Sequence, residues 1–112
     1  MPLLISHEIS LHAGVDPEEF ERFVQEQDYP TCPAFRSLLA FTVVGDAEVP
    51  GLYREFILVT DAEAFARDMD SKEFRRLEEK FGALAAVTSE TVEDVVGLGY
   101  RATHDIDRKE KL

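Results

Sequence analysis

Apolar and polar residues alternate from residue 3 to residue 11, and this period of two is typical of a strand with two chemically different faces. One face carries Ile5, His7, Ile9 and Leu11. The other face is mostly small or charged. A histidine within an otherwise apolar row is therefore the first candidate for chemistry in the chain.

Two further short segments predict strands, because β-branched and aromatic residues dominate both. They are residues 38–44 and residues 53–59, and a polar loop with turn residues joins them. Strands that are separated by so short a loop most simply pair as a hairpin.

A helix is predicted between the first two strands. Asp16 and Glu19 form a D-x-x-E capping box, and an apolar stripe follows it. We expect this helix to end near residue 27 or 28, because Pro30 and Pro33 cannot continue the ladder of backbone hydrogen bonds.

The second half of the chain predicts two helices and a last strand. Asp61 is the expected cap of a short helix, and a second capping box, Asp70 with Glu73, restarts or kinks it. Apolar residues at spacings of three and four then predict a longer helix that ends around Ala86. Residues 91–100 are expected to contain the last strand.

The element order βαββαβ predicts an α+β, ferredoxin-like fold, in which two helices cover one face of a four-stranded antiparallel sheet. Residues 1–102 are expected to form a single domain, followed by a charged, frayed tail at 103–112. Strands 38–44 and 53–59 carry apolar residues in both phases. Leaving the apolar second face of the sheet exposed to water would cost several kcal/mol, at roughly 25 cal/mol per Å² of apolar area. We therefore predict a homodimer whose two sheets pack face to face.

Composition excludes several classes of function. The chain of 112 residues has a net charge of −11, which argues against nucleic acid and anionic membranes as partners. One cysteine and three scattered histidines give no metal-ligand spacing, and no glycine-rich phosphate loop precedes a helix, so no metal and no cofactor are expected. No apolar stretch approaches the ~20 residues of a membrane span, so a cytoplasmic location is expected.

His7 and Glu55 are the candidate chemical groups of the strands. His7 can act as general acid or base, since its ordinary pKa is near neutral; alternatively it is a hydrogen-bonded core histidine. Glu55 shares a strand face with Tyr53 and Ile57, and a buried carboxylate there needs a partner. That partner would be either His7 across the sheet or an arginine at the edge of the dimer. The strand phase that faces the interior stays open, and a pair packed beneath the helices would argue against catalysis.

The histidine of the first strand and the D-P-x-x-F-E-x-F helix resemble the dimeric α/β-barrel superfamily. Within that superfamily three segments resemble the RedY/HapK-like family of bacterial secondary-metabolite clusters: Asp28-Tyr-Pro-Thr-Cys-Pro, Phe35-Arg-Ser-Leu and Tyr53-Arg-Glu-Phe-Ile. The resemblance implies cofactor-free cyclisation or related chemistry in a barrel cavity. It also implies that His7 is the base.

The resulting hypothesis is a cofactor-independent, cyclase-like or lyase-like enzyme that acts on an apolar or aromatic small molecule. His7 is the acid/base, Glu55 orients it, and Tyr29, held by Pro30 and Pro33 at the barrel mouth, donates a hydrogen bond. The expected ligand-binding residues are Ile9, Phe41, Tyr53, Arg54 and Ile57. A non-catalytic binding protein of the same fold is the first alternative. A cofactor-free monooxygenase is the second, and it ranks last because the chain has no tryptophan.

Overall fold

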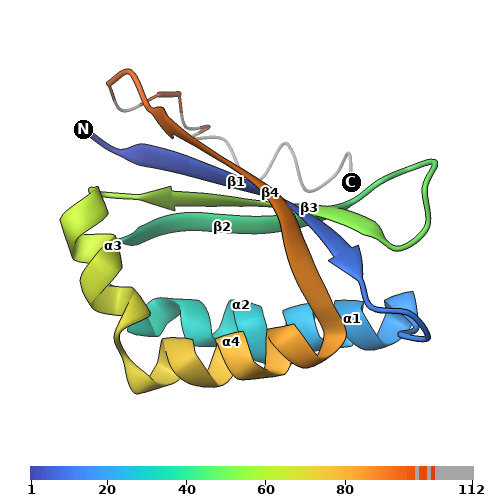
Figure 1. Cartoon of the computed structure of the whole chain (residues 1–112). Helices are drawn as coiled ribbons and strands as arrows, with labels where there is room; N and C mark the ends of the chain where they lie inside the picture. The colour runs from blue at the N-terminus through green and yellow to red at the C-terminus, as the bar shows by residue number, and fades with distance from the viewer. Residues whose placement is uncertain (98, 101, 103–112) are drawn as a thin grey trace.

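The computed structural model describes residues 1–97, 99, 100 and 102, and places four strands above a layer of helices (Figure 1). In chain order the elements are β1 (Leu3–Leu11), α1 (Pro17–Phe23), α2 (Tyr29–Thr31), β2 (Leu38–Gly45), β3 (Leu52–Val59), α3 (Ala62–Met69), α4 (Lys72–Leu84) and β4 (Ala85–Asp94). A π-helical segment, Val24–Asp28, joins α1 to α2, and a 3₁₀ turn, Cys32–Ala34, follows. The expected tail at 103–112 lies outside the described residues.

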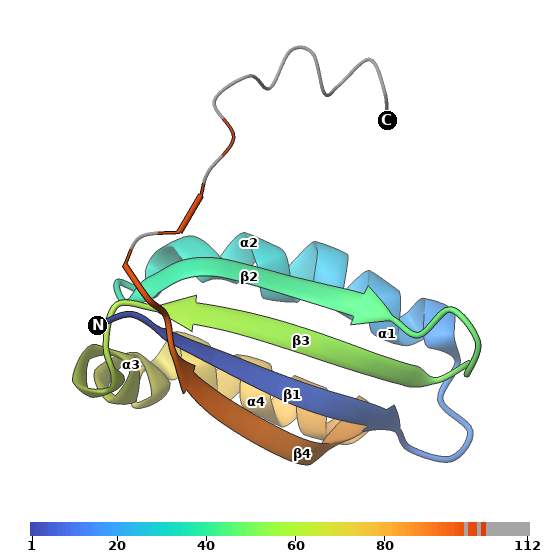
Figure 2. The ribbon, with the colours of Figure 1, turned by 90° about the horizontal axis from the view of Figure 1, so that it is seen from above.

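The sheet has the order β2-β3-β1-β4, and every neighbouring pair is antiparallel. Figure 2 shows the four strands side by side, with α1, α2 and α4 beneath the same face. The predicted hairpin is present, since β2 pairs with β3. The predicted ferredoxin-like α+β fold is confirmed.

The core identifies which strand phase faces the helices. Ile9 of β1 and Tyr53 of β3 are buried in one cluster with Phe20 and Phe23 of α1. The ring centroids of Phe20 and Tyr53 are 4.7 Å apart, which is a close aromatic contact between helix and sheet. Alternate residues of a strand share a face, so His7, two positions from Ile9, also points to the helix side.

The first helix does not end before its prolines, and this prediction was wrong. The helical segments α1, Val24–Asp28 and α2 form one continuous rod beneath the sheet (Figure 1). In the π-helical turn the Tyr29 amide donates to the carbonyl of Val24, five residues back, so the chain enters Pro30 on a widened ladder. The Thr31 hydroxyl donates to the carbonyl of Gln27 at 2.7 Å and adds a side-chain hydrogen bond to this turn.

The boundary between α3 and α4 is present, but its cap differs from the prediction. Asp61 caps α3 as expected, since its carboxylate accepts from the Ala64 amide. The N-cap of α4 is Ser71, whose hydroxyl accepts from the Phe74 amide. Asp70 instead ends α3 and pairs with Arg75.

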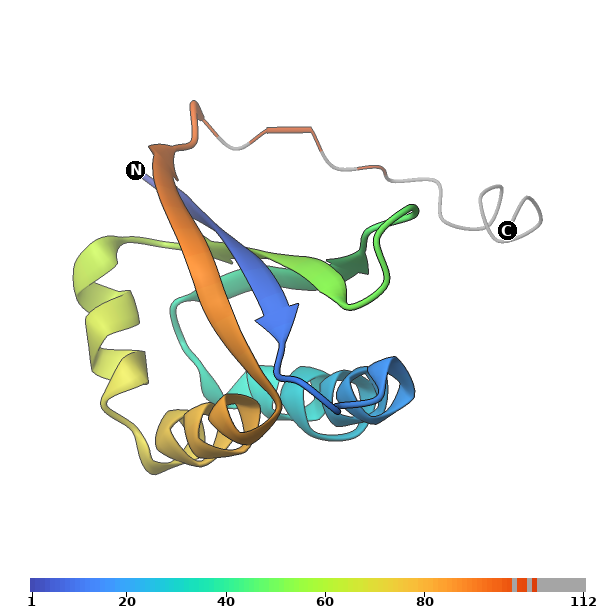
Figure 3. The same ribbon diagram turned by 45° about the vertical axis from the view of Figure 1, so that its right-hand side comes forward.

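The last strand begins at Ala85, not in the predicted stretch 91–100, and it ends at Asp94. It rises directly from the end of α4 and runs beside β1 (Figure 3). Among the residues predicted beyond it, Val96 is almost fully exposed and Leu98 lies outside the described residues. The start was missed because an exposed edge strand needs no apolar alternation, and its register also shifts opposite Glu8 and Ile9.

The face of the sheet away from the helices is covered by no described element (Figure 2). It carries Leu4, Phe56 and Leu58, which are half-buried, and Val44, which is exposed. The predicted homodimer would cover this face, and it stays a prediction.

Candidate functional site

The centre of the candidate site is His7, which lies at the middle of β1 between two carboxylates. Its register partners are Glu55 on β3 and Glu90 on β4. The His7 Nδ1 atom lies 2.6 Å from Glu55 Oε2, and its Nε2 atom lies 2.7 Å from Glu90 Oε2. The His7 and Glu55 side chains are 16% and 12% exposed, whereas Glu90 at the sheet edge is 59% exposed.

These contacts set the charge of the imidazole. The hydrogen bond to Glu55 raises the pKa of His7 most, burial opposes the rise, and the hydrogen bond to Glu90 adds to it. When both acceptors are carboxylates, both ring nitrogens donate. The raised pKa favours the imidazolium form of His7, which is held across three strands and can donate a proton.

The structure brings His7 and Glu55 together, as the strand patterns suggested, but on the helix side of the sheet. A pair beneath the helices was the arrangement expected to argue against catalysis, and a catalytic role for it therefore requires that a ligand enter at its exposed end, beside Glu90. The physical reason for this placement is the apolar row around the pair: Ile5, Ile9 and Ile57 are all buried, and it is the helix layer that buries them.

Asp28 completes the polar cluster, and sequence reasoning gave it no role. It lies at the end of the π-helical segment and is half-buried. Burial, and then the negative charge of Glu55, raise the pKa of the Asp28 carboxyl to about 7. The one signal in the sequence that could have identified Asp28 is its position as the first residue of the D-Y-P-T-C segment. Cys32, one turn further on, is an inert thiol because burial raises its pKa to about 11.

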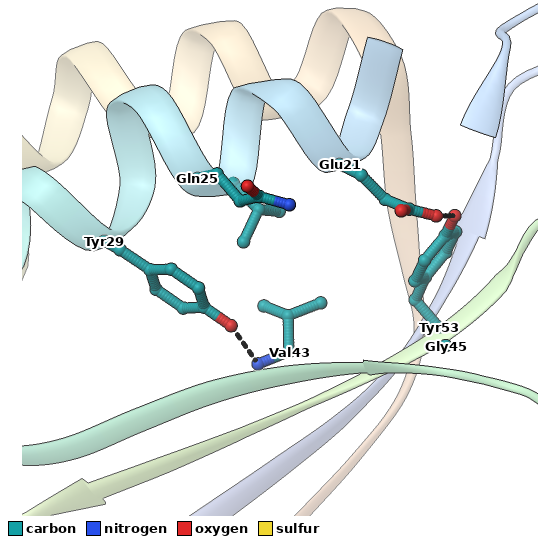
Figure 4. A pocket seen from close by; sticks show the side chains of 7 residues that line it. Glu21, Gln25, Tyr29, Val43, Gly45 and Tyr53 are labelled. Carbon is teal, nitrogen blue, oxygen red and sulfur yellow. Dashed lines mark hydrogen bonds between the residues drawn. The ribbon is translucent and has the colours of Figure 1, made fainter. Parts of the chain in front are cut away.

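Tyr29 does not join the His7 cluster. Its hydroxyl accepts from the Val43 amide at 3.0 Å, on the outer edge of β2 (Figure 4). The centroid of its ring lies 5.8 Å from that of Phe41. The tyrosine therefore connects the helical rod to an edge strand. It is 36% exposed, so a ligand at this edge could still touch the ring.

Two hollows open along the same edge, one on each side of Tyr29. The first, about 330 Å³, lies between α1, the π-helical segment and the strands (Figure 4), and is lined by Glu21, Val24, Gln25, Tyr29, Val43, Gly45 and Tyr53. At its end the Tyr53 hydroxyl donates to Glu21 at 2.6 Å, and burial raises the pKa of Tyr53 to about 12. The second, about 510 Å³, is lined mainly by Tyr29, Cys32 and residues 38–42. Neither is lined by His7.

The predicted ligand-binding residues divide between the two faces of the sheet. Ile9, Tyr53 and Ile57 are core residues on the helix side, and Phe41 packs against the same layer. Arg54 occupies the other strand phase and lies 3.4 Å from Asp46, so the structure does not bring it to His7. Within residues 1–97, 99, 100 and 102 there is no group of three ligating side chains that could hold a metal ion.

The order of the strands, the helices on one face and the polar cluster beneath them define a ferredoxin-like α+β protein. The chain belongs to the family of the REDY-like protein HapK, whose family model matches residues 4–96. The crystal structure of HapK from Hahella chejuensis is similar, with 36% identity and a TM-score of 0.77. The match covers 91% of this chain and 99% of that chain.

More distant structures share the fold alone. SnoaB from Streptomyces nogalater, a cofactor-independent oxygenase, matches at 16% identity with a TM-score of 0.74, over 86% of this chain and 94% of that chain. Rv0793 from Mycobacterium tuberculosis matches at 14% identity with a TM-score of 0.68, over 89% of this chain and all of that chain. A comparison with curated proteins finds no match. Among the helices of the described residues, none is long and apolar enough to cross a membrane.

Proposed function

We propose that the chain is a cofactor-independent, cyclase-like or lyase-like enzyme that performs acid–base chemistry on an apolar or aromatic small molecule beside His7. The observation that carries this proposal is the His7 imidazole held between Glu55 and Glu90 beneath the helix layer. Membership of the HapK family supports the setting, and the ligand would reach Nε2 from the exposed β4 edge, opposite to the hollows at the β2 edge.

His7 supplies the acid. Glu55 is nearly buried and fixes the ring through Nδ1, while Glu90 at Nε2 is exposed on an edge strand. A ligand that displaces the Glu90 side chain receives the Nε2–H bond in its place. The proton donor would then face a carbonyl or ring atom of the ligand.

A purely structural role accounts poorly for the cluster. Glu55 and Glu90 place two carboxyl groups against one imidazole, and burial together with the charge of Glu55 raises the pKa of Asp28 to about 7. Buried ionic groups are often less stabilising than apolar residues of the same volume. Groups that cost stability and have perturbed pKa values are typical of functional sites.

The test is turnover with a panel of aromatic and apolar biosynthetic intermediates, followed by mass spectrometry. We expect His7→Ala to lose about 10²- to 10⁴-fold of the rate, the usual contribution of a general acid or base. His12→Gln is the matched control, because His12 is an exposed histidine outside the cluster. Full activity of His7→Ala on a substrate that the wild-type protein converts would refute the acid–base role.

The first alternative is a binding protein without catalysis, which the hollows beside Tyr29 favour because they lie away from His7. It predicts saturable protection of a ligand at one molecule per site, with no product. A cofactor-free oxygenase is the second alternative, since SnoaB shares the fold. Consumption of oxygen on addition of substrate would identify it.

A further inference from the structure

The first hollow at the β2 edge has a floor that a glycine leaves open. Gly45, the last residue of β2, is the register partner of Tyr53 on β3. A Cβ atom at Gly45 would lie 3.4 Å from Tyr53 Cε1, in contact with the ring. The backbone does not require glycine here, because φ is not positive at Gly45. Glycine weakens a strand, and in strands it often marks the place where a ligand approaches closely.

One end of this hollow offers hydrogen-bond acceptors (Figure 4). The Tyr53 hydroxyl donates its proton to Glu21 Oε2 at 2.6 Å, so the phenol oxygen keeps only its lone pairs for a ligand. The second carboxylate oxygen of Glu21 has no hydrogen-bond partner among the described residues. Both groups therefore favour a ligand that brings an N–H or O–H donor to this end.

The opposite end of the hollow offers a donor. The Tyr29 hydroxyl accepts from the Val43 amide, and its own proton has no acceptor within the part of the chain that the structure describes. Gln25 lies between the two ends (Figure 4). Its side-chain amide has no partner in the described ranges and can donate or accept. This arrangement favours a ligand with a donor at one end and an acceptor, such as a carbonyl, at the other.

Between these ends the hollow is apolar and carries a single charge. Buried Val24 and half-buried Val43 form its walls. Glu21 is the one charged side chain among the seven described residues that line it, so an anion is repelled there. The volume of about 330 Å³ is at the small end of the range for ligand cavities, with room for roughly one or two rings.

We propose that this hollow is a binding site for a small, flat molecule, neutral or cationic, that donates a hydrogen bond to Glu21 and accepts one from Tyr29. Glu21 determines specificity, since it accepts from N–H and O–H groups and repels carboxylates and phosphates. The site is separate from the acid–base centre, because His7 does not line the hollow and its Nε2 atom faces Glu90 at the opposite edge of the sheet. The proposal therefore holds whether or not His7 performs chemistry.

The test is a nitrogen-15 NMR titration of the full chain with 4-hydroxybenzamide, a one-ring probe with an O–H donor at one end and a carbonyl at the other. We expect saturable shifts of the backbone amides of Gln25, Val43 and Gly45. The matched probe 4-methoxybenzamide lacks the donor and should bind about tenfold more weakly. The anion 4-carboxybenzamide should give no saturable shift. Equal binding of the three probes, or no saturable shift with 4-hydroxybenzamide, would overturn the proposal.

Two variants test the geometry of the site. Gly45→Val places a side chain over the Tyr53 ring and keeps the Glu21–Tyr53 hydrogen bond, so binding of 4-hydroxybenzamide should be lost. Glu21→Gln should weaken this probe about tenfold and remove the discrimination against 4-carboxybenzamide. Glu18→Gln is the matched control, because Glu18 is exposed on the same helix and does not line the hollow. Wild-type affinity in Gly45→Val or in Glu21→Gln would refute the site.

Discussion

At the scale of single residues, the polar cluster couples the stability of the fold to pH. Both His7 and Asp28 have raised pKa values in the folded chain. For each, the folded state holds its proton to a higher pH than the unfolded state does. The free energy of unfolding therefore falls as pH rises, from about pH 4 for Asp28 and from about 6.5 for His7.

A single substitution isolates the contribution of Asp28 to the pH dependence of the free energy of unfolding. We predict that Asp28→Asn stabilises the protein at pH 8 by an amount on the order of a few kcal/mol, and changes stability much less at pH 4. The reason is that the folded state no longer has to ionise a buried carboxyl above pH 7. Urea unfolding at the two pH values measures it. An equal change at both pH values would show that Asp28 is ionised in an ordinary environment.

Part of the site was predictable from residues and part was not. The pairing of His7 with Glu55 follows from strand patterns, because residues of the same phase on neighbouring strands meet across the sheet. Glu90 was missed because β4 was placed too late in the chain. The electrostatic effect of Glu55 on Asp28 depends on how the helical rod lies on the sheet, which no local pattern encodes.

At the scale of elements, tertiary packing and side-chain hydrogen bonds decided where helices begin and end. Pro30 suggested a break, but a π-helical turn and the hydroxyl of Thr31 carry the rod past it. This extension places Asp28 and Tyr29 over the sheet. The position of both residues therefore depends on a helical continuation that Pro30 argued against.

The cap of α4 gives a prediction at this scale. Ser71→Ala removes the hydroxyl that accepts from the Phe74 amide and should cost about 1 kcal/mol. Asp70→Ala removes only an exposed pair with Arg75 and should cost clearly less. Thermal unfolding of the two variants compares them. A larger loss of stability for Asp70→Ala would indicate instead that Asp70 caps α4, as the sequence suggested.

At the scale of the whole molecule, the sheet has one face covered by helices and one face uncovered. Phe56 and Leu58 are central on the uncovered face, and apolar area of this kind is usually covered by a partner. A second copy of the chain, as the strand patterns predict, would leave the His7 cluster untouched on the far side.

We therefore predict that Phe56→Glu converts a dimer into a monomer, because it places a charge at the centre of the apolar face. Val49→Glu is the matched control, since Val49 is an exposed apolar residue in the loop between β2 and β3. Light scattering coupled to gel filtration gives the mass of each. A wild-type protein that is monomeric at all concentrations would show that the uncovered face has another role.

The most direct test of the central claim is nitrogen-15 NMR of the His7 ring between pH 5 and pH 9, because it needs no substrate. The His7–Glu55 and His7–Glu90 contacts predict both ring nitrogens protonated at neutral pH, with a titration midpoint above 6.5. In Glu55→Gln this midpoint should fall. A midpoint at or below 6.5 that Glu55→Gln leaves unchanged would mean that His7 is a neutral core residue and that the acid–base account is wrong.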